Sequence, residues 1–242
     1  MLLYSDHEEE NAPHTQAVAL ILYKAARNAH VGWKSHRSRI IKASFKTEKD
    51  GITMNIVQCY APTNDSNKND KDQFYERLQS IIEKCPRKGL TILMGDLNAK
   101  VGINSIGYED IMGRYGLGER NEIEERFANL RAFNKLVIGG TIFPLKRIHK
   151  ATWISLDHTT ESQIDHICVN RKFRRTMEDV RTKRGADIAS DHHLGMEKMK
   201  LKLKKRKARN TIDSSEPLRR FGLHRSPSPP IPYTRTNEDE DN

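Results

Sequence analysis

The sequence predicts a mixed α/β domain, because short apolar strands alternate with amphipathic helices along most of its 242 residues. Residues 17–23 (AVALILY) form a short apolar run typical of a buried strand. Residues 70–84 carry Phe74, Leu78, Ile81 and Ile82 at helical spacing, and this helix should end before Pro86. The next apolar run (TILMG, 91–95) predicts another buried strand, so strand and helix alternate here.

The remaining elements fit the same class. Residues 40–45 and 52–60 alternate apolar and polar positions, as half-buried strands do, and Asp50-Gly51 between them is a hairpin signal. Residues 122–136 place Ile123, Phe127, Leu130 and Phe133 on one face of a second helix. Further strands are expected at 136–138, 151–154 and 164–169.

The charge is concentrated at the C-terminal end. The chain has a net charge of +10, and residues 198–242 hold 12 Lys and Arg against 6 Asp and Glu. From residue 204 onward a basic cluster is followed by a Pro/Ser-rich stretch and an acidic end, a composition that cannot bury a core. We therefore expect a domain over 1–203 and a disordered tail over 204–242. The basic surplus favours polyanionic partners, although a solvated surface explains it equally well.

Three cysteines, Cys59, Cys85 and Cys168, match no zinc motif and predict no complete disulfide framework. This usage is typical of an intracellular protein, nuclear or cytoplasmic. The sequence contains no apolar run of 18 residues, so no membrane span is expected. The apolar run in the opening MLLYSDHEEE is too short for a signal peptide. Because the segment then turns acidic at once, it resembles the interior of a domain more than its start.

Individual polar motifs are weak signals. Asp96 and Asn98 follow a buried strand on one face of the chain, at the carboxyl end where α/β folds bind ligands, yet both are also ordinary turn residues. The same ambiguity holds for Ser190-Asp191-His192 as an exposed loop and for Asp165 as a strand end. A basic run at 171–175 could contact substrate phosphates or form a solvated hairpin tip.

The combination of motifs is specific. The segments QCYAP (58–62), GDLN (95–98), ATW with QIDH (151–153 and 163–166) and SDHH (190–193) resemble, in order and spacing, the endonuclease/exonuclease/phosphatase superfamily. The strings ILMGDLNAKVG, KRIHKATW and KRGADIASDHHL resemble the endonuclease domains of RTE-like non-LTR retrotransposons and craniofacial development protein 2-like proteins. The resemblance covers about residues 7–204. It implies a DNase I-like four-layer sandwich of two mixed sheets flanked by helices.

The resemblance also implies a chemistry, the hydrolysis of DNA phosphodiesters with Mg²⁺ or Mn²⁺, which neutralises charge on the phosphate and on the leaving oxygen. By this resemblance Asp96 orients and deprotonates the water, Asn98 donates to the phosphate, and Asp165 holds His192 against the scissile phosphate. Asp191 lies near the metal. The family's phosphate-contacting positions correspond to Tyr60, Thr152 and Ser190, although Tyr60 could equally be a core aromatic and Thr152 a plain strand residue.

One departure from the family bears on activity. The family's first strands carry an Asn and the Glu that is its principal metal ligand, and neither motif occurs in this sequence. We therefore expect a fold that lacks these strands and a weak or inactive nuclease. The leading interpretation is a DNA endonuclease domain from a retrotransposon, partnered in the parent element by a reverse transcriptase. The alternatives are a non-catalytic nucleic-acid-binding remnant and a phosphatase of the same superfamily.

Overall fold

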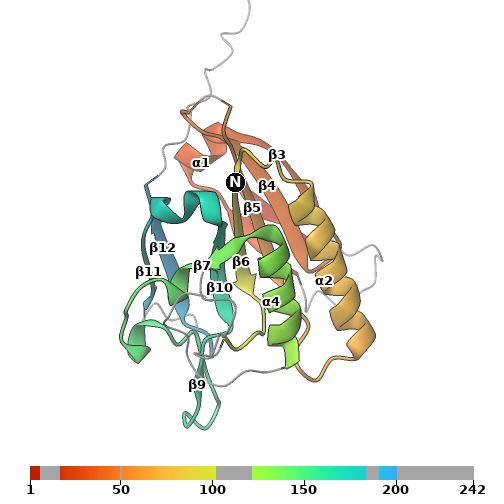
Figure 1. Ribbon diagram of the computed structural model, residues 1–242, viewed down its shortest axis with the longest axis vertical. Coiled ribbons are helices and arrows are strands. Elements are labelled where there is room, and N and C mark those ends of the chain that lie inside the picture. The colour runs from red at the N-terminus through yellow and green to blue at the C-terminus, as the bar shows by residue number, and fades with distance from the viewer. Residues whose placement is uncertain (6–16, 50, 102–121, 184–190, 201–242) are drawn as a thin grey trace, which may run out of the picture. The chain divides into compact units, whose positions relative to one another are not determined.

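A six-stranded mixed sheet forms the centre of the protein, with strand order β3-β4-β5-β6-β10-β7. The computed structural model describes residues 1–5, 17–49, 51–101, 122–183 and 191–200, all within the compact unit Met1–Arg206 (Figure 1). The strands of this sheet are β3 (His30–Ser35), β4 (Ile40–Lys46), β5 (Thr53–Tyr60), β6 (Leu90–Asp96), β7 (Leu136–Ile138) and β10 (Asp165–Asn170).

The strand directions follow from the connections between the strands. The β4–β5 hairpin is antiparallel and turns at Gly51, whose φ of 75° suits glycine. Strands β5 and β6 are parallel, so the chain must cross back between them, and helix α2 (Lys68–Glu83) makes this crossover. Strand β10 pairs antiparallel with β6 and with β7. The end of β6 therefore lies beside the start of β10.

Two helices cover one face of the sheet. Helices α2 and α4 (Glu122–Asn134) pack together and bury their apolar side chains against β5, β6 and β10 (Figure 1). The α2 N-terminus is capped by Asn67, whose side chain accepts a hydrogen bond from the Asp70 backbone N–H at 2.8 Å. Both predicted helices are confirmed in position. Phe133 is an exception, because it is 70% exposed and lies outside the buried stripe of α4.

Short strand pairs cover the other face. Strands β1 (Leu2–Tyr4) and β2 (Ala19–Ile21) form one antiparallel pair, and β11 (Met177–Lys183) and β12 (Leu194–Met199) form another. Leu3, Leu20 and Val180 from these pairs join Phe45 and Ile92 of the central sheet in a second apolar cluster. The predicted mixed α/β class is confirmed. In the described residues, the strands on this face form separate antiparallel pairs.

The opening residues were also interpreted wrongly in part. No strand was expected at Leu2–Tyr4, yet this segment pairs with β2. The other elements that the sequence did not predict include strand β3, the short helix α1 (Lys24–Ala29) and the strand pair β11–β12. The remaining short elements are the β8–β9 hairpin (Trp153–Ile154 and Glu161–Ser162) and the 3₁₀ turns η2 (Gly139–Thr141), η3 (Arg147–His149) and η4 (Arg171–Thr176).

The other sequence-based expectations have mixed outcomes. All three cysteines are free and buried. Among the described residues, no helix has the length and apolar character needed to cross a bilayer. Lys198, which starts the basic C-terminal run, belongs to β12, and its amino group lies 3.4 Å from the Glu178 carboxylate. The predicted boundary at residue 203 and the tail that follows lie outside the described residues.

Candidate active site

The candidate site forms where three neighbouring strands meet one loop. Asp96 is the last residue of β6 and Asp165 is the first residue of β10, and the two are direct partners across the antiparallel ladder. Tyr60 at the end of β5 is the partner of Asp96 on its other side. His192 reaches the site because its backbone bridges to Trp153 of β8. Residues that lie up to 132 positions apart in the sequence are thus brought to one end of the sheet.

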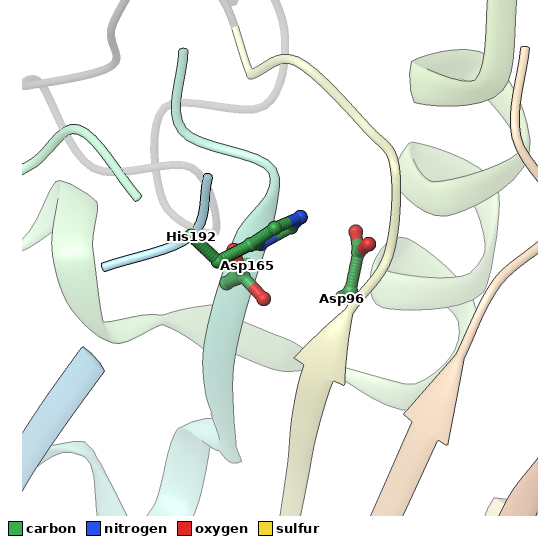
Figure 2. A group of neighbouring side chains, drawn as sticks. All are labelled: Asp96, Asp165 and His192. Carbon is green, nitrogen blue, oxygen red and sulfur yellow. The ribbon is translucent and has the colours of Figure 1, made fainter. Parts of the chain in front are cut away.

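His192 and Asp165 form a hydrogen-bonded pair. The His192 Nδ1 atom lies 2.9 Å from Asp165 Oδ2, and both side chains are partly exposed (Figure 2). The hydrogen bond to the carboxylate raises the pKa of His192, because it stabilises the protonated ring. Donation from Nδ1 to Asp165 fixes the tautomer and the orientation of the ring.

Asp96 lies opposite this pair in an unfavourable place for a charge. Burial raises the pKa of Asp96 to about 7, and the negative charge of Asp165 adds to the shift. A backbone hydrogen bond from Asn98 N–H to Asp96 Oδ1, at 2.9 Å, opposes it. One ligand atom each from Asp96, Asp165 and His192 lies within 4.8 Å of the others. Figure 2 shows the Asp96 carboxylate at the tip of β6, across from the other two side chains.

Gly95 explains why β6 can end so close to β5. A Cβ atom at this position would lie 1.9 Å from the Cys59 carbonyl oxygen, and the backbone has a φ of 134°, which side chains rarely adopt. Only glycine fits this contact without displacing the strand. The glycine in the GDLN motif therefore has a packing reason, since it sets the position of Asp96.

Asn98 ties together the loops that follow the two parallel strands. Its side-chain Nδ2 donates to the Ala61 carbonyl at 2.9 Å, and its backbone has a φ of 49°, a conformation that asparagine tolerates. This contact holds the segment after Asp96 against the segment after Tyr60. A direct role of Asn98 towards phosphate stays a prediction.

The side chains expected to contact phosphate have different surroundings. Thr152 is buried, and its hydroxyl oxygen accepts hydrogen bonds from the backbone N–H groups of Ile164 and Asp165 at 3.1 and 3.0 Å. Thr152 thus holds the start of β10 in place. Tyr60 is half-buried, and the Arg39 guanidinium lies 5.1 Å from the centre of its ring. Ser190 lies outside the described residues.

Asp191 was expected to lie near the metal. Its Oδ2 accepts a hydrogen bond from the indole Nε1–H of Trp153 at 2.8 Å, and its backbone carbonyl accepts from Ile154 N–H at 3.0 Å. Among the described residues, the acidic and histidine group that could hold a cation consists of Asp96, Asp165 and His192, without Asp191. The assignment of Asp191 as a metal ligand stays a prediction.

Two residues near the site were not singled out from the sequence. His166 is 1% exposed, and burial lowers its pKa to about 4. Its neutral ring bonds the Ala99 carbonyl through Nε2 at 2.7 Å and stacks on Phe127, so it supports the segment after Asp96. The sequence signal for this burial is the position of His166 two residues before Cys168 in β10, which puts both side chains on the same face of the strand. Arg39 places its guanidinium beside Tyr60 at the end of β5. The sequence did not indicate this contact.

The basic run at 171–175 is placed wrongly by the sequence-based interpretation. Strand β10 begins at the site with Asp165 and runs away from it, so Arg171 follows at the opposite end of the sheet. The five residues of β10 between them correspond to about 17 Å. These cations form the 3₁₀ turn η4 instead of a hairpin tip and cannot contact a phosphate held at His192.

The chain is similar to proteins of known name. No protein-family model matches the sequence. Craniofacial development protein 2 from Bos taurus is 38% identical over 189 residues, which cover 77% of this chain and 31% of the relative. The protein of the same name from Tragulus javanicus is 37% identical over 189 residues, 77% of this chain and 32% of the relative. The chain thus spans about a third of the length of these relatives.

Solved structures are similar in fold. The endonuclease domain of TRAS1, a telomere-specific non-LTR retrotransposon, aligns with a TM-score of 0.56 at 13% identity, covering 86% of this chain and 81% of that one. A 3'-5' exonuclease from Neisseria meningitidis aligns with a TM-score of 0.53 at 20% identity, covering 72% of each chain. The chain therefore shares the DNase I-like fold of these solved structures, and its sequence resembles that of craniofacial development protein 2.

Proposed function

We propose that this chain is a DNA endonuclease domain that hydrolyses phosphodiesters with the help of a divalent cation. The observation that carries this proposal is the convergence of Asp96, Asp165 and His192 at one end of the sheet, with His192 hydrogen-bonded to Asp165. The names of the structural neighbours, an endonuclease domain of a retrotransposon and an exonuclease, support a substrate of the nucleic-acid class.

The cluster suits a cation of the Mg²⁺ or Mn²⁺ type. Two carboxylates face each other here, and their mutual repulsion helps to raise the pKa of Asp96. A divalent cation bound between them relieves that repulsion, and carboxylate oxygens are the ligands that hard cations prefer. Asp96 and Asp165 would hold the ion, which would neutralise charge on the scissile phosphate.

The side chains themselves can perform the proton transfers of hydrolysis. Asp96 lies at the end of β6, where its carboxylate could accept a proton from the attacking water. His192 carries a proton more readily than free histidine, because Asp165 stabilises the charged ring. From Nε2 it can donate a hydrogen bond to a non-bridging phosphate oxygen as negative charge develops there. Asp165 acts through His192, since its contact fixes the ring and its tautomer.

Within this proposal the chain derives from a retrotransposon, and its own activity is weak. The motif strings from Ile92 onward support the first part, because they resemble those of non-LTR elements. The second part rests on the small ligand set, since only two carboxylates converge among the described residues and one of them bonds His192. Such a site should bind Mg²⁺ loosely and work best in millimolar Mn²⁺.

The test is nicking of supercoiled plasmid by the full chain in Mg²⁺, in Mn²⁺ and in EDTA. Nicking should occur with Mn²⁺, stop in EDTA and be lost in His192→Ala and Asp96→Asn. The matched controls are His158→Asn and Asp65→Asn, which change exposed loop residues and should cut like the parent. Asparagine suits position 158, where φ is 56°. Cutting that persists in EDTA or in both site variants would overturn the proposal.

The alternative function, a phosphatase of the same superfamily, can be distinguished from a nuclease by the substrates that the chain hydrolyses. The chain should open plasmid without releasing inorganic phosphate from sugar phosphates or inositol phosphates. Release of phosphate from those compounds, lost in His192→Ala and unaccompanied by nicking, would replace the nuclease assignment. Retained DNA binding with neither reaction in any metal would indicate a non-catalytic remnant.

A further inference from the structure

A solvent-open cavity of about 640 Å³ lies at the end of the sheet opposite to Asp96. Three loops form it, the ones that follow α2, α4 and β10. Thr91 near the start of β6 lines the cavity, and the five residues from there to Asp96 correspond to about 17 Å. The cavity is therefore separate from the candidate active site and is not used by the chemistry proposed above.

Hydrogen bonds between the loops fix the walls of this cavity. The Asn170 side chain accepts from Thr91 N–H at 3.2 Å and donates to the Gly89 carbonyl at 2.9 Å, which joins the end of β10 to the loop after α2. The Arg171 backbone N–H donates to the Lys135 carbonyl at 2.8 Å, which joins the same end of β10 to the loop after α4. The side chains of the three loops are thus held at fixed places around one space.

The lining is strongly basic. Four exposed cations surround the cavity, contributed by all three loops: Arg87, Lys135, Arg171 and Lys172. Among the described residues the acidic side chain in the lining is Glu83, whose carboxylate accepts a hydrogen bond from Gln79 at 2.8 Å. Four like charges around one space repel each other, and a polyanion would relieve that repulsion.

An exposed aromatic ring stands in the same lining. Phe133, at the end of α4, is 70% exposed although its helix spacing predicted burial. The α4 stripe that packs on the sheet consists of Ile123, Phe127 and Leu130, which are buried. Phe133 therefore contributes little to the core, and its ring face is free to stack on a planar group beside the cations.

We propose that this cavity binds single-stranded nucleic acid, with the four cations on the phosphate backbone and Phe133 stacked against one base. Cations that follow the backbone, together with an aromatic ring for an unpaired base, are the elements of single-strand recognition. A duplex offers no base face for the ring, because its bases are already stacked. The site goes beyond the proposed hydrolysis and does not depend on it.

Binding can be measured without any cleavage. Fluorescence anisotropy of a labelled oligothymidylate of 15 nucleotides is followed in EDTA, with the full chain carrying His192→Ala. The site variants are Lys135→Asn with Lys172→Gln, and separately Phe133→Ala. Asparagine is chosen at position 135 because its φ is 52°. The control pair is Lys24→Gln with Lys34→Gln, exposed lysines on α1 and on the far edge strand β3.

The lysine pair should remove two phosphate contacts and reduce the slope of log K against log salt by about 1.4. If the proteins bind alike in 1 M salt, this slope predicts a loss of affinity of about 25-fold at 0.1 M salt. Phe133→Ala should weaken single-strand binding about fivefold or more, as loss of one stacked base does. The control pair and a blunt duplex of equal length should show neither effect.

Three results would overturn the proposal. Equal binding by the site variants and the parent would show that the cavity does not contact the strand. Equal losses of affinity in the lysine-pair variant of the site and in the control pair would show that only the net charge of the protein matters. A loss with the lysine pair but not with Phe133→Ala, and equally large on duplex, would exclude the single-strand assignment. Because the assay runs in EDTA without His192, failure of the proposed nuclease activity cannot produce any of these results.

Discussion

Asp96→Asn should change how the stability of this protein depends on pH. Burial raises the pKa of Asp96 to about 7 in the folded protein, against 3.8 for an ordinary aspartate. Between these two values the folded state binds more protons than the unfolded state. The free energy of unfolding therefore falls as pH rises from about 4 to about 7, and the stabilising effect of the protonated form is lost above that.

The magnitude follows from these two pKa values. By linkage, the contribution of Asp96 to the free energy of unfolding decreases by about 2–3 kcal/mol between pH 5 and pH 8. In Asp96→Asn this loss should be absent, because the amide does not titrate. The amide oxygen can still accept the hydrogen bond from Asn98 N–H, so the substitution keeps the local geometry. The variant should thus be the more stable protein at pH 8 in the absence of metal.

Urea denaturation of both proteins at several pH values, with EDTA present, measures this difference. Other titrating groups, such as Glu197 with a pKa near 7, contribute to both curves, so the quantity to compare is the gap between them. Asp65→Asn, an exposed carboxylate before α2, is the matched control and should run parallel to the parent. A gap between parent and Asp96→Asn that stays constant from pH 5 to pH 8 would refute the argument from burial.

Three further outcomes are expected. Asp165→Asn should lower the pKa of His192, followed by NMR of the ring protons, and slow nicking by at least about 10-fold, since it removes both a charge-assisted hydrogen bond of about 1.5 kcal/mol and one of the two carboxylates proposed to hold the cation; an unchanged titration would contradict the pairing. Deleting residues 201–242, which leaves β12 intact, should reduce the salt slope of duplex binding by about 0.9 for each lost phosphate contact; an equal slope would assign the basic tail no part in binding. Adding a segment with the family's first strands and its metal-binding Glu should raise nicking in millimolar Mg²⁺, and equal rates would show that this Glu is dispensable.

Local periodicity was enough to predict most of the sheet and both long helices. The α2 stripe of Phe74, Leu78, Ile81 and Ile82 and the alternation of β5 depend on side chains within a few residues of one another. The same reasoning missed β3, because none of the six residues of this edge strand is buried and its sequence shows no clear apolar alternation. It missed β1 because three residues are too few to show a period.

The sequence predicted that Asp96, Asp165 and His192 lie together, and the structure brings these three side chains close, with His192 hydrogen-bonded to Asp165. Their catalytic roles stay predictions. The backbone contacts of Thr152 and the indole contact of Asp191 could not be foreseen. Each joins segments that are distant in sequence, and its geometry is set by how those segments pack.

By itself the sequence determined the fold class and the strand ends that carry polar side chains. Only the tertiary structure decided what surrounds them. Burial by other segments moves the pKa of Asp96 towards neutrality, and the antiparallel direction of β10 carries the basic run away from the site to a separate cavity. The physical reason is that periodicity records which side chains share a face, whereas pKa values and surface charge depend on neighbours from elsewhere in the chain.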